Sequence, residues 1–214
     1  SHICWVPRLM RVGSAVIRAG AIGYTATHPE YRHLGLASAL MEAWTDELTQ
    51  RGEHLSFVTG IPKFYEQFGY EFSFPLDRRD SPLSIDPSRL SSEAGEMSVR
   101  QYRESDLPTL MALYEEENAI RTGSLVRAPE YWEWLLQGLQ ASGWVKREDI
   151  WLVEGSDHQP LGYAMLHPAP LDRLEVWEAA VTSDDAASAL LNAVAARPRS
   201  EGISRIDFKL PLSH

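Results

Sequence analysis

Seven consecutive residues combine the features of an anion-binding site. They are Arg32, His33, Leu34, Gly35, Leu36, Ala37 and Ser38. A helical pattern begins within this segment, and the first turn of a helix exposes backbone N–H groups that lack partners and carry partial positive charge. Small side chains let a bulky anion come close, so the segment suits a pyrophosphate and, on the residues alone, could serve any phosphate-bearing cofactor. It is neither a P-loop, which ends in Gly-Lys-Ser/Thr, nor the dinucleotide motif with three spaced glycines.

Such a site needs a strand before the helix and another after it. The segment Ser14–Thr27 is rich in Ala, Val, Ile, Tyr and Thr, and it predicts one or two strands with a turn near Gly20. From Gly35 to Gln50 the apolar residues follow helical spacing, at Leu36, Leu40, Met41, Trp44 and Leu48. Arg51-Gly52 is a typical helix end. We expect Trp44 to be buried and His28 to order the turn before Pro29.

Three short elements complete the first half. Leu55–Val58 predicts a buried strand, Pro62–Phe68 predicts one or two helical turns that end at Gly69, and the alternation in Tyr70–Phe74 predicts a strand. A strand–helix–strand crossover implies a parallel pair inside a mixed sheet. We expect a first domain at residues 1–80 and a linker at 81–96, in a stretch rich in Ser, Pro, Asp and Arg.

Residues 97–214 show a related order of elements and predict a second domain. The expected elements are a strand at Ser98–Arg100, a helix from Ser105 or Asp106 to about Asn118, a helix at Pro129–Leu139, a hairpin of Ile150–Val153 and Leu161–Leu166, a strand at Leu174–Val181, a helix at Ala186–Ala195 and a strand at Ile203–Leu210. The fold class is therefore α/β (α+β), with two mixed sheets and flanking helices.

Two motifs in the first half resemble those of the GNAT superfamily of N-acetyltransferases. Arg32-x-x-Gly35-x-Ala37 is similar to the family's acetyl-CoA signature, Gln/Arg-x-x-Gly-x-Gly/Ala. The segment Phe64–Tyr70 resembles the family's Phe-Tyr-x-x-x-Gly-Phe/Tyr element. Their combination is most similar to the tandem-GNAT, Eis-like subgroup, with the opening and closing elements of that pattern missing from this chain. Such proteins join a catalytic GNAT domain to a degenerate second one.

The resemblance implies a role for each matching residue. The backbone amides from Arg32 through Ala37 and Ser38 would hold the pyrophosphate of acetyl-CoA. Apart from the resemblance, we expect the His33 side chain to be exposed, where it could contact the nucleotide part. The backbone of Thr25, Ala26 and Thr27 would pair with the pantetheine arm. Tyr65 would protonate the leaving thiolate when an amine attacks the thioester, since a phenol with a pKa near 10 can supply that proton.

Several alternatives stay open on the sequence alone. Tyr65 can instead be an aromatic plug against the following strand. The general base is unassigned, with water or Glu30 as candidates. An acyl-CoA sensor without turnover and a structural module are the competing functions. The second half has Asp184-Asp185 at the corresponding helix start and lacks the signature, so we expect it to bind no CoA and to shape the acceptor pocket or an oligomer interface.

Composition narrows the classes of function. The 214 residues carry a formal charge of −10, which disfavours nucleic acid as a partner. No apolar stretch or leader predicts membrane insertion, and the single cysteine, Cys4, fits a reduced cytoplasmic protein. His158, His167 and His214 lack metal-ligand spacing, so no metal is expected. The aromatic residues Tyr131, Trp132, Trp134 and Trp144 are expected in a core, with a stacking surface as the alternative.

Overall fold

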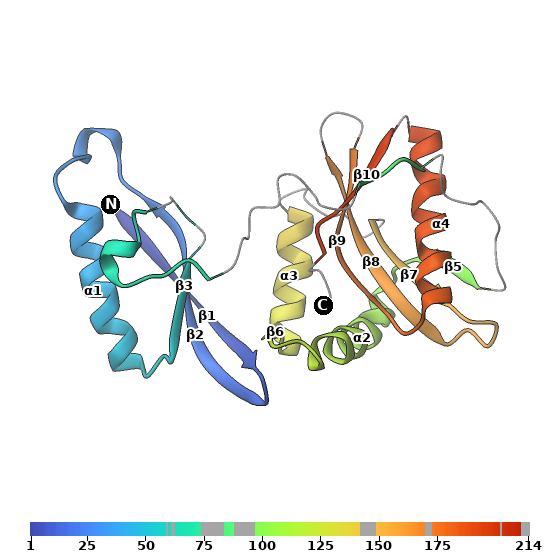
Figure 1. Ribbon diagram of the computed structural model, residues 1–214, viewed down its shortest axis with the longest axis horizontal. Coiled ribbons are helices and arrows are strands. Elements are labelled where there is room, and N and C mark those ends of the chain that lie inside the picture. The colour runs from blue at the N-terminus through green and yellow to red at the C-terminus, as the bar shows by residue number, and fades with distance from the viewer. Residues whose placement is uncertain are drawn as a thin grey trace. The chain divides into compact units, whose positions relative to one another are not determined.

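Each of two parts of the chain builds a mixed sheet around one parallel strand pair (Figure 1). The computed structural model describes residues 1–58, 60, 63–73, 84–87, 97–141, 149–169, 173–201 and 203–210. The first unit comprises Ser1–Asp77 with Arg121–Val126, and the second comprises Arg78–Ile120 with Arg127–His214. The mixed α/β class predicted from the sequence is confirmed, and each unit is described by itself.

The first unit holds a four-stranded sheet in the order β3-β2-β1-β6. The strands β1 (His2–Val12) and β2 (Ala15–Ala26) form a long antiparallel hairpin. Its turn contains Gly13, whose φ of 58° suits a residue without a Cβ. The strand β3 (Leu55–Val58) runs parallel to β2, and β6 (Gly123–Val126) pairs antiparallel with β1.

The helix α1 (Leu36–Arg51) is the crossover between β2 and β3, as the apolar spacing predicted (Figure 1). Its buried residues are Met41 and Trp44, which pack with Ile22 of β2. The helix ends at Gly52, which has a φ of 65° and whose N–H donates to the carbonyl oxygens of Leu48 and Thr49. This left-handed glycine satisfies the last carbonyls of the helix, as expected for the Arg51-Gly52 stop.

Three details of the first unit differ from the sequence-based expectation. No turn interrupts β2 near Gly20; instead Gly20 lets α1 approach, because a Cβ there would lie 2.7 Å from Leu48 Cδ2. Residues 2–12, which were assigned no element, form β1. The predicted strand Tyr70–Phe74 is wrong for residues 70–73, which form no strand, and Phe74 lies outside the described residues.

Two short 3-10 helices belong to the first unit, one before α1 and one after β3. The helix η1 (Pro29–Tyr31) follows the turn at His28, and η2 (Glu66–Phe68) ends at Gly69, with a φ of 84°. The predicted helical turns over Pro62–Phe68 are therefore shorter than expected, since residues 63–65 form a turn; Pro62 lies outside the part that the structure describes.

The second unit holds a six-stranded sheet in the order β4-β10-β9-β8-β7-β5. Its strands are β4 (Ser84–Ile85), β5 (Ser98–Gln101), β7 (Ile150–Glu154), β8 (Pro160–Ala169), β9 (Arg173–Val181) and β10 (Arg205–Phe208). The predicted strands and hairpin are confirmed, and β4 adds a short strand inside the expected linker 81–96. The strands β9 and β10 are parallel and are joined by α4 (Asp184–Glu201).

Helices cover both faces of this second sheet (Figure 1). The helices α2 (Leu107–Ala119) and α3 (Pro129–Ala141) enclose one core with β7 and β8, in which Trp132 is 1% exposed. Residues of α4, including Leu190 and Val194, enclose the other core. The core assignment of the aromatic residues holds for Trp132 but not for Trp134, which is 55% exposed because it lies on the outer face of α3; Trp144 falls outside the described residues.

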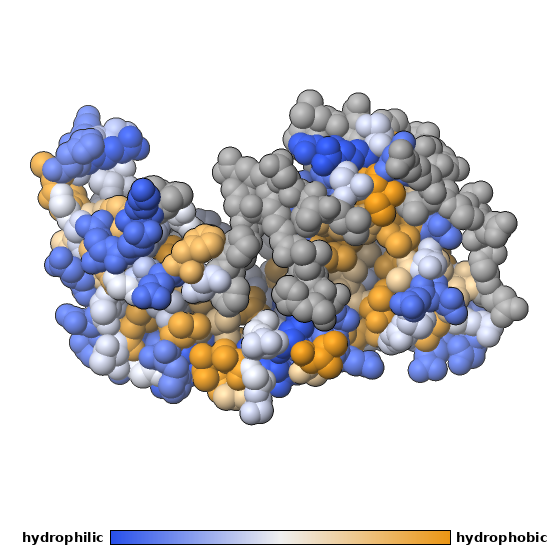
Figure 2. Space-filling model, viewed as in Figure 1, coloured by the Kyte–Doolittle hydropathy of each residue, from blue (hydrophilic) through white to orange (hydrophobic). Residues whose placement is uncertain are grey.

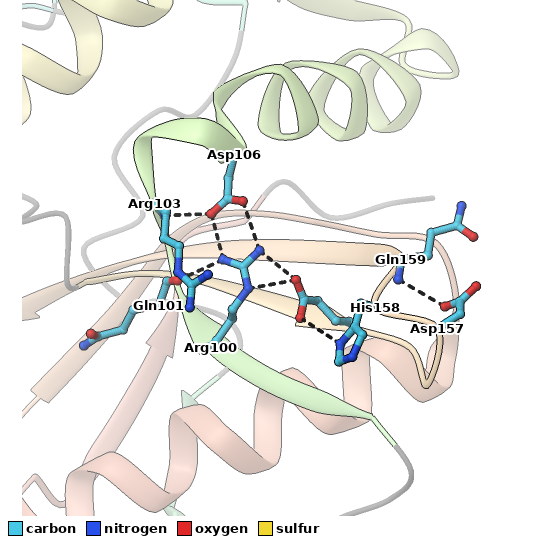
Figure 3. Close-up of polar contacts among 8 residues, drawn as sticks. Arg100, Gln101, Arg103, Asp106, Asp157, His158 and Gln159 are labelled. Carbon is cyan, nitrogen blue, oxygen red and sulfur yellow. Dashed lines mark hydrogen bonds and ion pairs between the residues drawn. The ribbon is translucent and has the colours of Figure 1, made fainter.

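Two part-buried ionic clusters join elements of the second unit. Arg100 of β5 donates two hydrogen bonds to the carboxylate of Asp106, at 2.7 and 2.9 Å, and one to Glu154 of β7 (Figure 3). Hydrogen bonds from Arg100 hold the pKa of Asp106 below its usual value. The cluster therefore joins two strands to η4 (Glu104–Asp106), the turn that starts α2.

The second cluster lies between the sheet and α3. Arg127 donates to both carboxylate oxygens of Glu178, at 2.9 and 2.6 Å, and the Tyr163 hydroxyl donates to the same carboxylate at 2.8 Å. The guanidinium also stacks on Tyr114, 4.0 Å from the ring centroid. Burial raises the pKa of Tyr114 to about 12. These contacts give Arg127 and Glu178 partners of opposite charge, as a buried ion pair requires.

Candidate functional site

The end of β2 extends beyond its neighbour β3. The parallel pairing stops at Ile22 and Val58, whereas β2 continues through Gly23 to Ala26. On its other side β2 pairs with β1, and the register shifts between His2 and Cys4. Tyr24 lies at this irregularity with a φ of 49°, which is unusual for a residue with a bulky side chain, and it is 81% exposed. On the side of β2 that faces β3, the main-chain N–H and C=O groups of Gly23–Ala26 thus pair with no strand among the described residues.

A compact loop leads from β2 to α1. The Tyr31 N–H donates to the His28 carbonyl oxygen at 2.9 Å and closes the turn through the backbone. The Arg32 side chain folds back, and its Nε donates to the Thr27 carbonyl oxygen at 3.3 Å. The Glu30 carboxylate is exposed and lies 4.0 Å from His28 Nδ1. The loop therefore presents its polar side chains to solvent, and the segment before α1 is mostly hydrophilic in the space-filling view (Figure 2).

The first turn of α1 is open. Gly35 is the N-cap residue, with a φ of 75°, and no side chain caps the helix. The N–H of Ala39 donates to the Gly35 carbonyl oxygen at 3.0 Å and begins the helical ladder, so the N–H groups of Leu36, Ala37 and Ser38 precede it. No heavy atom lies within 4 Å of a Cβ built on Gly35, and Leu34 is 65% exposed. An anion can therefore reach these amides from solvent.

Tyr65 lies beside the end of the parallel strand pair. Its half-buried ring packs against the cluster of Ile22, Met41 and Trp44. Within the described part of the chain, the Tyr65 hydroxyl makes no hydrogen bond. Packing of the ring alone matches the plug interpretation, whereas the unpaired hydroxyl gives the acid interpretation a group with an available proton.

Tyr70 provides the contrast. Its hydroxyl lies 2.5 Å from Ser56 Oγ and accepts a hydrogen bond from Trp44 Nε1 at 3.2 Å. Ser56 Oγ donates its own proton to the Gly20 carbonyl oxygen at 3.0 Å, so the Tyr70 hydroxyl is the donor of the pair. Tyr70 therefore serves the structure of the unit, whereas the hydroxyl of Tyr65 has no hydrogen-bond partner among the residues that the structure describes.

The equivalent helix start in the second unit is closed. Only Thr182 and Ser183 separate β9 from α4, and Ser183 Oγ accepts a hydrogen bond from the N–H of Ala186 at 3.2 Å. Asp184 and Asp185 occupy the first turn, and the residue that caps the helix is Ser183. This helix start does not suit a pyrophosphate. The Ser183 hydroxyl already accepts from a first-turn N–H group, and the two carboxylates repel an anion.

All residues assigned to a site from the sequence lie in the first unit. Thr25 and Thr27 lie at or just beyond the end of β2, Arg32 to Ser38 form the loop and first turn of α1, and Tyr65 precedes η2. Two residues of this region were not singled out: Tyr24, whose backbone conformation has no sequence signal, and Tyr70, whose partners come from distant segments. Among the described residues, no group of His, Cys, Asp and Glu could hold a metal ion.

The chain resembles known proteins in the sequence of its first part and in its fold. Residues 1–73 of the 214 match the family model of the acetyltransferase (GNAT) domain. The fold resembles an Enterococcus faecalis protein described as a probable N-acyltransferase, with 19% identity, a TM-score of 0.75, and coverage of 96% of this chain and 50% of that one. Eis1 from Mycobacterium abscessus gives 21% identity, a TM-score of 0.64 and coverage of 99% and 54%.

A third structure carries a ligand. Saccharomyces cerevisiae N-myristoyltransferase with bound myristoyl-CoA gives 11% identity, a TM-score of 0.60, and coverage of 96% of this chain and 59% of that one. At these identities the likeness concerns the fold, and this chain spans about half the length of the first two structures. No curated protein matches the sequence. No helix in the described ranges has the length and apolarity needed to span a membrane.

Proposed function

We propose that the chain is an acyl-CoA-dependent N-acyltransferase that moves an acetyl group from acetyl-CoA to an amine. The observation that carries this proposal is the open first turn of α1 directly after the free end of β2. A bound diphosphate needs several convergent N–H donors, and an extended pantetheine arm needs a strand edge with unused main-chain groups. The first unit offers both along one continuous stretch of chain, although two carbonyl oxygens of this edge, those of Ala26 and Thr27, already accept from Ser1 Oγ and Arg32 Nε.

The cofactor roles follow from this arrangement. The amides from Arg32 to Ser38 receive the diphosphate, and the left-handed Gly35 keeps a side chain out of its approach. The main chain of Thr25, Ala26 and Thr27 pairs with the pantetheine, while the exposed His33 lies beside the nucleotide. The bound myristoyl-CoA of the yeast structure supports an acyl-CoA as the donor. The acetyltransferase family model supports acetyl as the group that is transferred.

The chemistry is a direct transfer. A neutral amine attacks the thioester carbonyl, the C–N bond forms, and the C–S bond breaks. Water takes the proton that the amine loses, and Tyr65 gives its phenolic proton to the departing thiolate, which leaves as CoA-SH. The Tyr65 phenolate then regains a proton from solvent, which returns the enzyme to its starting state. Main-chain N–H groups near Ala26 stabilise the oxyanion. Holding both substrates together supplies much of the rate, so no covalent enzyme intermediate is required.

The second unit is proposed to be a degenerate copy of the first. Its strand–helix–strand crossover, β9–α4–β10, repeats the order of β2–α1–β3, with parallel outer strands in both. Because its helix start is capped and acidic, it takes no CoA and serves instead to shape the acceptor site or a contact between subunits. We place the two domains at residues 1–80 and 97–214, as in the tandem, Eis-like arrangement, with Arg121–Val126 from the second range contributing β6 to the sheet of the first unit.

Calorimetry and a thiol-release assay test this proposal with one pair of variants. Wild-type protein should bind CoA and release thiol from acetyl-CoA in the presence of a suitable amine from a panel. Gly35→Glu should abolish CoA binding, because it places a carboxylate where the diphosphate approaches. Gly13→Glu is the matched control: Gly13 also has positive φ and open space at its Cβ, but it lies at the opposite end of β2.

The outcomes separate the candidate functions. Equal CoA affinity of the Gly35→Glu and Gly13→Glu variants would refute the proposed diphosphate site. Binding without thiol release across the whole panel would identify an acyl-CoA sensor. Absence of CoA binding to the wild-type protein would leave a structural module.

A further inference from the structure

Gly60 lies directly against the ring of Tyr65. A Cβ built on Gly60 would lie 2.2 Å from Tyr65 Cε2, 3.0 Å from Cζ and 3.1 Å from the hydroxyl oxygen. Such distances are far below van der Waals contact, so the ring occupies the space that any other residue type at position 60 would fill. The contact reaches the phenol end of the ring, which carries the proton that matters for Tyr65.

The ring is also held on its other sides. Phe64 meets it edge to face, with centroids 5.0 Å apart and planes at 87°. Tyr70 lies 6.0 Å away at 67° and is itself fixed by its hydrogen bonds to Ser56 and Trp44. The Tyr65 carbonyl oxygen accepts the N–H groups of Phe68 and Tyr70, at 3.0 and 3.3 Å, which fixes the backbone. A ring pushed from Gly60 therefore moves its hydroxyl, because the backbone and two flanking rings resist other responses.

The local connection explains why this contact bears on the site. Gly60 follows β3 by two residues, and β3 ends beside Ile22, where β2 continues alone. The same cluster of side chains contains Ile22, Val58 and Tyr65. Gly60, which lies just after β3, therefore contacts the phenol close to the end of β2.

We propose that Gly60 is a positioning residue: its missing side chain sets where the Tyr65 hydroxyl stands relative to the end of β2. This inference rests on the proposed function, in which that hydroxyl protonates the leaving thiolate. Gly60 touches neither substrate, and it acts only through the ring of Tyr65.

Steady-state kinetics of Gly60→Ala test the inference. A displacement of a catalytic group by about 1 Å can reduce turnover on the order of 100-fold, so kcat should fall by about that factor. The KM for acetyl-CoA should stay unchanged, because the diphosphate and pantetheine contacts are elsewhere. In the Tyr65→Phe background the same Gly60→Ala change should have no further effect on kcat, since no phenol remains to be displaced.

A second readout does not depend on activity. With fluorotyrosine incorporated, the ¹⁹F resonance assigned to Tyr65 by its loss in Tyr65→Phe should shift in Gly60→Ala. An unshifted resonance would overturn the inference, whether or not the wild-type protein releases thiol. Failure of the wild-type protein to release thiol would refute the proposed function separately. An equal fall of kcat in the presence and absence of the phenol would also overturn it, because it would indicate a general structural effect.

A double variant keeps the inference testable if Gly60→Ala does not fold. If Gly60→Ala alone does not fold, adding Tyr65→Ala removes the overlapping ring and should restore the folded protein, as measured by circular dichroism. Failure of the double variant to fold would show that position 60 does not act through Tyr65 and would overturn the inference.

Discussion

Two neighbouring tyrosines should respond in opposite ways to the loss of one oxygen atom. Tyr70→Phe removes a hydroxyl that bonds to Ser56 and accepts from Trp44. Trp44 Nε1 keeps a contact with Ser56 Oγ at 3.4 Å, and Ser56 still donates to the Gly20 carbonyl oxygen, so the change removes hydrogen bonds without leaving either partner alone. Each part-buried hydrogen bond lost costs about 0.5–1.5 kcal/mol. For a domain of roughly 60–100 residues each kcal/mol lowers the melting temperature by about 4–8 °C. The first unit of Tyr70→Phe should therefore melt at a clearly lower temperature.

Tyr65→Phe should show the reverse pattern. The ring and its packing remain, and within the described residues the hydroxyl has no partner to lose, so the free energy of unfolding should change by less than about 0.5 kcal/mol. Removal of a general acid should lower kcat by about 10²–10⁴-fold. The affinity for CoA should be unchanged, because the diphosphate site is untouched.

Differential scanning calorimetry and the thiol-release assay measure the two effects on the same samples. Each variant serves as the control for the other, since both remove the same atom from the same short segment. A large loss of stability in Tyr65→Phe would mean that its hydroxyl is bonded. Unchanged turnover in Tyr65→Phe would remove it from the mechanism, and either result would refute the assignment of roles.

Two predictions concern the second unit. Arg100→Met should destabilise the second unit most above about pH 4 and progressively less below it, as measured by urea unfolding across pH. The pKa of Asp106 is lower in the folded state than in the unfolded state. Its ion pair with Arg100 therefore stabilises the fold above the unfolded-state pKa, and this stability is lost as the pH falls through the folded-state pKa. A pH-independent difference between Arg100→Met and wild type would contradict this. Glu178→Ala should cost about 3–5 kcal/mol in urea unfolding, because it leaves the Arg127 guanidinium buried without a counter-charge. The double variant Arg127→Met, Glu178→Leu should cost less than Glu178→Ala alone, and the opposite order would count against that reasoning.

Local signals made α1 predictable from the sequence. Its apolar residues recur at helical spacing, and Gly35 and Gly52 bound it with backbone conformations that favour glycine. The strand β3 was equally clear, because a short apolar run follows a helix stop. These elements are specified within a few residues, so the crossover and its parallel pair could be derived without the structure.

Other elements depend on distant partners. The strand β1 contains Pro7 and two arginines, which weaken its pattern, and it forms because β2 offers a full antiparallel edge. The alternating Tyr70–Phe74 segment predicted a strand, but the hydroxyl of Tyr70 is held by Ser56 and Trp44 while Phe72 is 82% exposed. The approach of Gly60 to Tyr65 is likewise a tertiary contact, and no spacing in the sequence indicates it.

The irregular end of β2 also bears on self-association. An exposed strand edge invites pairing with a strand of another molecule and can seed aggregation. Here the register shift opposite Cys4 and the left-handed Tyr24 break the regular sequence of donors and acceptors along Gly23–Ala26. A flat peptide strand cannot follow that edge residue by residue, whereas a slender flexible arm can bond to it at single points. The same distortion thus discourages sticking between copies and leaves the edge usable for a small molecule.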